Sequence, residues 1–127
     1  MGYGVNMRTY EFTLPWAPSI NGYWRAVRGR QIISKRGRDY RKSALIELGN
    51  TGLLNEKLSG RLSVTLKLNP PTLRKYDLDN FCKGVFDALT EGQFWLDDEQ
   101  VDRLTITKGE KVKGGTVDVT VACYEQV

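Results

Sequence analysis

Apolar residues at every second position predict the strands of this protein. In the segment RTYEFTLPW, the residues Tyr10, Phe12 and Leu14 alternate with polar residues until Pro15. The segment RLSVTLKLNP, residues 61–70, repeats this alternation and ends in proline. A period of two places such side chains on one face of a strand, and proline interrupts the hydrogen bonds of a sheet.

Two further strand patterns, QVDRLTITKG and GTVDVTVACY, lie near the end of the chain. The segment EKVKGG between them is rich in lysine and glycine. A short turn of this composition between two strands is typical of a β-hairpin. We therefore expect these two strands to pair with each other.

Apolar residues at steps of three and four predict two helices. The first runs from Lys35 to about Leu54, with an apolar stripe made of Tyr40, Ala44, Leu45 and Leu48. The second begins at the sequence DLDN, with a stripe made of Leu78, Cys82, Val85, Phe86 and Leu89. This spacing puts each stripe on one face of its helix. The opposite face of the first helix is basic, which suits either solvent or nucleic acid.

The segment APSINGYWRAVRGRQIIS, residues 17–34, is rich in turn residues, and we expect a loop or a small hairpin around Gly29. In and just before this segment, aromatic residues stand beside arginines: Trp16, Tyr23 and Trp24 precede Arg25, Arg28 and Arg30. Such a mixture suits stacking on bases combined with phosphate contacts, and it equally suits aromatics that cap the core.

The order of these elements predicts an α+β fold. Two amphipathic helices packed on one face of a mixed four-stranded sheet would bury every apolar stripe. The length of 127 residues and the apolar content of 40% suit one core. We therefore expect residues 1–127 to form a single domain.

Histidine is absent, and the two cysteines, Cys82 and Cys123, lie far apart in the sequence. Within one chain this excludes a zinc site of Cys and His ligands, nucleophiles activated by His, and haem bound through imidazole. Hydrolytic chemistry would then rest on carboxylates, Lys, Tyr or a metal ion held by oxygen. We expect no organic cofactor. The chain has no apolar run of membrane-spanning length and no signal-peptide pattern, so we expect no membrane partner and a cytoplasmic location.

Charge is distributed very unevenly along the chain. The formal charge is +10 over residues 1–76, −7 over residues 77–102 and +1 over residues 103–127, which gives +4 for the protein. The basic excess points to a polyanionic partner such as nucleic acid. The gathering of acids in one segment of a basic protein indicates a separate role for them.

Asp77 and Asp79 open the second helix. In an extended segment they point to the same side and can share one ligand, whereas the structural alternative is that one of them caps the helix. Lys83 and Asp87 follow at steps of four, a spacing that a salt bridge along the helix would also explain.

The segment FWLDDEQVD places adjacent acids after a bulky apolar run, which we expect to anchor this loop to the core. If the strand after Glu99 returns beside the start of the second helix, Asp98 or Asp97 closes on Asp77 and Asp79. Three carboxylates held together repel one another unless one is protonated or a cation lies between them, and such hard ligands suit Mg²⁺ or Mn²⁺. An EF-hand is excluded, because its loop needs Gly at position 82 and Glu at position 88, where this sequence has Cys and Ala.

A metal-binding acidic cluster within a basic surface is the layout of a metal-dependent nuclease. Basic residues position the phosphate backbone, and a lysine beside the cluster, here Lys83, assists the attacking water or stabilises the transition state. The alternative from the residues alone is a structural network of acids.

Three segments extend this interpretation: LPWAPSINGYWR (14–25), DLDNFCKGVFDAL (77–89) and FWLDDEQV (94–101). Together with the strands between them, they cover nearly the whole chain. In this order and spacing the sequence resembles the RusA-type crossover junction endodeoxyribonucleases, phage and prophage enzymes that resolve four-way (Holliday) DNA junctions.

The resemblance implies a homodimer that makes paired nicks in branched DNA during recombination and repair, in a bacterial host cell. It implies one Mg²⁺ site per subunit, which we expect Mn²⁺ to fill as a substitute. The family's metal ligands and catalytic aspartates correspond to Asp77, Asp79 and Asp98, with Asp97 as a neighbour, and its catalytic lysine corresponds to Lys83. Candidate contacts to the DNA backbone are Arg25, Arg28, Arg30, Arg36, Arg74 and Lys75.

The sequence departs from the family pattern at two places. Position 17 is Ala where the family commonly has Pro, which affects the stiffness of the loop. Only Arg74 and Lys75 precede Tyr76, where the family often has a longer basic run. We expect this difference to affect junction affinity or the preferred cleavage sequence and not the chemistry. The competing hypothesis is a basic protein that binds junctions without cutting them.

Overall fold

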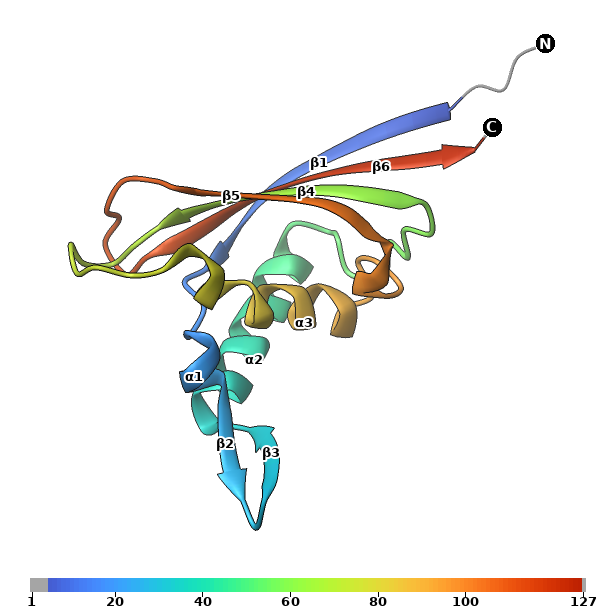
Figure 1. The fold of residues 1–127 in the computed structure, drawn as a ribbon. Coiled ribbons are helices and arrows are strands. Elements are labelled where there is room, and N and C mark those ends of the chain that lie inside the picture. The colour runs from blue at the N-terminus through green and yellow to red at the C-terminus, as the bar shows by residue number, and fades with distance from the viewer. Residues whose placement is uncertain (1–4, 127) are drawn as a thin grey trace.

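A mixed four-stranded sheet forms one layer of the protein (Figure 1). The computed structural model describes residues 5–126. Its sheet contains β1 (Val5–Pro15), β4 (Arg61–Asn69), β5 (Val101–Lys108) and β6 (Thr116–Gln126), in the order β1-β6-β4-β5. β4 and β5 run parallel, and the other neighbours are antiparallel. The predicted α+β class and mixed sheet are confirmed.

The predicted hairpin between the last two strands is wrong, because β4 lies between β5 and β6. The loop 109–115 instead crosses the end of β4, where Gly109 N donates to Leu68 O at 2.6 Å and Val112 N donates to Pro70 O at 2.9 Å. Two strand spacings amount to roughly 10 Å, which a loop of this length spans. The inward side chains of β4 are fully buried, and a central place in the sheet satisfies its backbone on both sides.

Two helices, α2 (Lys35–Asn50) and α3 (Lys83–Glu91), cover one face of the sheet, as the pattern predicts (Figure 1). Ala44 and Leu48 of α2 and Val85 and Leu89 of α3 are buried in the same core as the inward side chains of β4 and β6. α2 ends earlier than predicted. Gly52 takes a φ of +76°, and Leu53 N then bonds back to Leu48 O, an arrangement that commonly terminates helices.

The second predicted helix is interrupted near its start. The sequence DLDN enters a 3₁₀ turn, η1 (Leu78–Phe81), and α3 begins only at Lys83, after Cys82. The predicted apolar stripe still packs on the core, since a 3₁₀ turn changes the spacing of side chains only slightly.

A two-stranded ribbon of β2 (Trp24–Val27) and β3 (Arg30–Ile33) projects from the helical layer (Figure 1). Its turn, Arg28-Gly29, has positive φ at both residues, which matches the right-handed twist of the strands and confirms the expected hairpin. The short helix α1 (Ile20–Tyr23) precedes the ribbon and was not predicted. Ser34 ties these parts together, because its hydroxyl donates to Gly22 O and accepts from Gly37 N at the start of α2. None of the described helices is long and apolar enough to cross a membrane.

Candidate functional site

The loop that carries Asp97 and Asp98 is anchored by two aromatic side chains. Phe94 and Trp95 are completely buried, and Trp95 Nε1 donates to Thr90 Oγ1 of α3 at 2.6 Å. This confirms the predicted anchor for these two residues. Leu96 does not take part, since 53% of its surface is exposed.

Gln100, which the sequence reasoning missed, fixes the backbone of this loop. Its side-chain oxygen accepts from Leu96 N and Asp97 N, and its amide nitrogen donates to Leu58 O at 2.7 Å and Gly60 O at 2.9 Å. Gln100 is the third residue after Asp97, and together they form a capping box around the 3₁₀ turn η2 (Asp98–Gln100). The D-x-x-Q pattern was the signal that would have identified it.

The two acids of this loop have different roles in the structure. The side chain of Asp97 accepts from Glu99 N at 2.9 Å and caps η2. Asp98 lies at the face of α3, against which η2 packs. Partial burial raises the pKa of Asp98, and the neighbouring carboxylates of Asp97 and Asp87 add to this, whereas Lys83 opposes it. The carboxylate of Asp98 thus sits where negative charge is already concentrated and a cation is favoured.

Asp77 and Asp79 stand at the start of η1, which packs against β5. Asp77 is extended, with φ −98° and ψ 133°, and its side chain makes no capping hydrogen bond. Both residues are exposed, and neither side chain forms an ion pair or a hydrogen bond with the rest of residues 5–126. Asp77 therefore occupies the N-cap position of η1, as the capping alternative predicts, but it makes no side-chain cap hydrogen bond.

Lys83, the first residue of α3, is held from two sides. Its Nζ lies 3.1 Å from Asp87 Oδ1 and 5.6 Å from the centre of the Trp24 ring at the base of the ribbon. Its charge also acts on Asp98. The structure therefore brings Asp98 of η2 near Lys83 and Asp87 of α3.

Comparison of the sequence with known proteins places this chain in a family. The family model described as Endodeoxyribonuclease RusA matches residues 15–123. The chain belongs to the RusA endodeoxyribonuclease family. It is 41% identical over 115 residues to the crossover junction endodeoxyribonuclease RusA of Shigella sonnei (strain Ss046), covering 91% of this chain and 95% of the relative. The corresponding proteins of Escherichia coli (strain K12) and Enterobacteria phage 82 are each 40% identical over the same shares.

Within residues 5–126 of this RusA family member, no three Asp, Glu or Cys side chains converge closely enough to hold a metal ion. The donor chemistry nevertheless fits Mg²⁺, because the predicted ligands offer only carboxylate oxygens, and burial together with neighbouring acids raises the pKa of Asp98. That Asp77 and Asp79 join Asp98 around one ion stays a prediction.

The predicted DNA contacts of the RusA chain lie on three exposed parts of the surface. Three arginines are on the ribbon, Arg36 is at the start of α2, and Arg74 and Lys75 lie between β4 and η1. Among the described residues, none of the six side chains forms a salt bridge, so their charges are available to phosphates.

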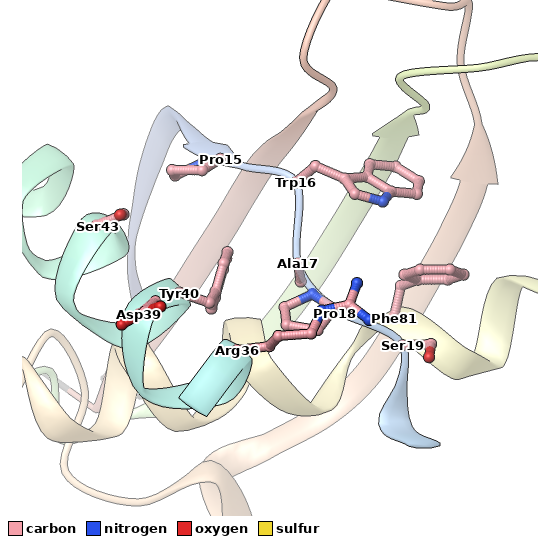
Figure 2. A pocket seen from close by; sticks show the side chains of 10 residues that line it. All are labelled: Pro15, Trp16, Ala17, Pro18, Ser19, Arg36, Asp39, Tyr40, Ser43 and Phe81. Atoms are coloured by element: carbon pink, nitrogen blue, oxygen red, sulfur yellow. The ribbon is translucent and has the colours of Figure 1, made fainter. Parts of the chain in front are cut away.

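A groove of about 510 Å³ lies between the Pro15–Ser19 segment, α2 and η1 (Figure 2). Trp16 and Phe81 form one part of its wall, with ring centres 4.9 Å apart, and Arg36 and Asp39 line it from α2. The three aromatic residues beside the arginines thus differ in exposure. Tyr23 is completely buried, as the core alternative predicts, whereas Trp16 and Trp24 are partly exposed near the acidic segment.

Proposed function

We propose that this chain is a Mg²⁺-dependent endonuclease that resolves four-way DNA junctions by paired nicks in phosphodiester bonds. The observation that carries the proposal is that η2, which begins at Asp98, packs against α3, which begins at Lys83, in a chain of the RusA family. The match to the relatives named above covers 95% of their length. They are crossover junction endodeoxyribonucleases, which supports the same substrate class here.

Asp77, Asp79 and Asp98 are the residues that would hold the ion. When bound, Mg²⁺ supplies a Lewis acid for the scissile phosphate and lowers the pKa of a coordinated water, and Mn²⁺ substitutes for it. Asp98 is suited to this role because its loop is fixed by Gln100 and the buried pair Phe94 and Trp95, so its carboxylate is placed without the ion's help.

Lys83 acts at the phosphate rather than at the ion. Its ammonium group neutralises charge that accumulates on the phosphate oxygens, or it orients the attacking water. The position of Nζ between Asp87 and the Trp24 ring limits the directions in which it can point, which supports a fixed role in the site.

The exposed basic residues would align the substrate. The base of the ribbon adjoins Lys83 through the Trp24 ring, and Arg74 and Lys75 come shortly before Asp77 in the chain, so a DNA arm that contacts both basic segments would also meet the carboxylates. A homodimer would present two such sites to the nearly two-fold symmetric junction, and this symmetry is the physical basis for paired nicks.

The proposal is tested with a synthetic four-way junction that carries different fluorophores on two opposing strands. The protein is incubated with this junction and with a linear duplex of the same sequence, in Mg²⁺, Mn²⁺ or EDTA. We expect symmetric cuts in both labelled strands of the junction only when a metal ion is present. If the protein retards the junction on a gel but does not cut it with either metal ion, the result would instead support the non-catalytic binding protein.

The dimer is tested separately. Light scattering gives the mass of the protein in solution, which is compared with the chain mass of 14.4 kDa. A mass of twice this value is expected in solution. A monomer that still makes paired nicks would contradict the symmetric arrangement and leave the metal chemistry in place.

A further inference from the structure

Two Lys–Asp pairs with the same helical spacing have different surroundings. On α2, Lys35 and Asp39 lie 2.7 Å apart with 80% and 62% of their side chains exposed. On α3, Lys83 and Asp87 lie 3.1 Å apart with 37% and 20% exposed. The first pair fits the usual solvated salt bridge. The second is more shielded from water, and shielding restricts the directions in which its side chains can point.

Behind Asp87 lies a second set of polar side chains. The hydroxyl oxygen of the buried Tyr23 accepts a hydrogen bond of 3.2 Å from Arg41 Nη2 of α2. Because this bond uses the Tyr23 oxygen as an acceptor, the phenolic proton remains free to be donated. Burial raises the pKa of Tyr23, the hydrogen bond from Arg41 lowers it, and the carboxylate of Asp87 raises it.

The helices approach closely at this point. A Cβ added to Gly84 would lie 3.3 Å from the Tyr40 ring and 3.4 Å from the Tyr23 ring. Glycine at this position therefore lets α3 lie against α1 and α2, and Asp87 follows on the next turn of α3. Arg41 is restrained too, since its Nε is buried without a partner in residues 5–126 and its Nη2 bonds to Tyr23.

We infer that Asp87 is a positioning residue for Lys83 in junction cleavage, and that Tyr23 and Arg41 hold the Asp87 carboxylate in place. This inference rests on the proposed function, in which Lys83 acts at the phosphate. Asp87 and the Trp24 ring restrain the ammonium group from two sides, and Asp98 stands close enough to act on it. In this inference the Tyr23 hydroxyl donates to Asp87, which would connect the observed Arg41–Tyr23 hydrogen bond to the observed Asp87–Lys83 ion pair.

The test compares Asp87→Asn with Asp39→Asn, which breaks the exposed pair of identical spacing. Single-turnover nicking and junction affinity in EDTA are measured for both variants. We expect Asp87→Asn to slow nicking by up to about 100-fold with unchanged affinity, because a displaced catalytic group loses rate rather than binding. Asp39→Asn should nick as the unmodified protein does.

A second readout needs neither DNA nor metal. The rate at which an N-hydroxysuccinimide ester acylates Lys83 is followed by peptide mass spectrometry. Loss of the ion pair frees the amine, so Asp87→Asn should accelerate acylation of Lys83 by about two- to five-fold and leave Lys35 unaffected. Tyr23→Phe keeps the buried ring and removes only the hydroxyl, and it should shift both readouts in the same direction by a smaller factor.

Nicking and Lys83 acylation at unmodified rates in Asp87→Asn and Tyr23→Phe would overturn the inference. If the unmodified protein does not nick junctions, the proposed function fails. The acylation rates would still decide whether Asp87 and Tyr23 fix Lys83.

Discussion

Gln100 and Leu58 are joined by a buried hydrogen bond of 2.7 Å from the side-chain amide to the main-chain carbonyl. This bond connects the loop of Asp98 to the segment that leads into β4. The rigidity of the acidic site therefore depends on a residue that is itself no candidate ligand.

Replacing Gln100 by alanine should destabilise the protein by about 2 to 4 kcal/mol. The change leaves the carbonyls of Leu58 and Gly60 without their side-chain partner and removes the acceptor of two backbone N–H groups. Urea denaturation followed by circular dichroism measures this loss. Gln31→Ala, at an exposed position of β3, is the control and should change the free energy of unfolding by less than about 0.5 kcal/mol.

Asp79→Asn should reduce nicking of a four-way junction by at least about 100-fold, because one proposed ligand loses its charge. Junction binding in EDTA should be preserved or strengthened, since a negative charge near the phosphates is removed. Gel retention and cleavage of the same labelled junction give both quantities. Loss of binding together with cutting would contradict a purely catalytic role for Asp79.

Arg74→Gln combined with Lys75→Gln should weaken junction binding and reduce its dependence on salt. Each phosphate contact that is lost should lower the slope of log K against log salt concentration by about 0.9. Lys111→Gln combined with Lys113→Gln, in the exposed loop between β5 and β6, removes the same charge and serves as the control. An unchanged slope in the first variant would remove Arg74 and Lys75 from the DNA-contacting surface.

Asp102 should make the stability of the protein depend on pH. Hydrogen bonds from Arg61 hold the pKa of this carboxyl below its usual value of 3.8. Its contribution is therefore present above pH 3.8 and is lost as the pH falls through the lower pKa of the folded state. Asp102→Asn should melt at a lower temperature than the unmodified protein at pH 7, and the two melting temperatures should approach each other on acidification. A constant difference across this range would contradict the assignment.

Local patterns predicted the elements of this fold well, because most strands and helices here bury one face. β1 and β4 follow their alternation, and α2 follows its apolar stripe almost to its end. The neighbours of each strand were less predictable. The last two strands are consecutive in the chain but separated by β4 in the sheet, and a turn sequence carries no information about a strand that comes from elsewhere.

The candidate site was likewise predictable only in part. The anchoring of the acidic loop was predicted from Phe94 and Trp95, whose apolar character alone requires burial. The contacts of Gln100 with Leu58 and of Arg41 with Tyr23 join side chains that are distant in sequence and have no periodic signal. Polar contacts of this kind depend on the packed fold, which is why the sequence indicated the acids but not the residues that hold them.

Within residues 5–126, β5 pairs only with β4 and forms an edge of the sheet. Amides at such an edge exchange with solvent through local opening that needs much less free energy than global unfolding. The turn that carries Asp98 leads directly into β5, so transient fraying of this strand would loosen the turn on one side, while Gln100, Phe94 and Trp95 still hold it on the other. Nucleic acid bound along this edge would suppress that opening and slow amide exchange in β5.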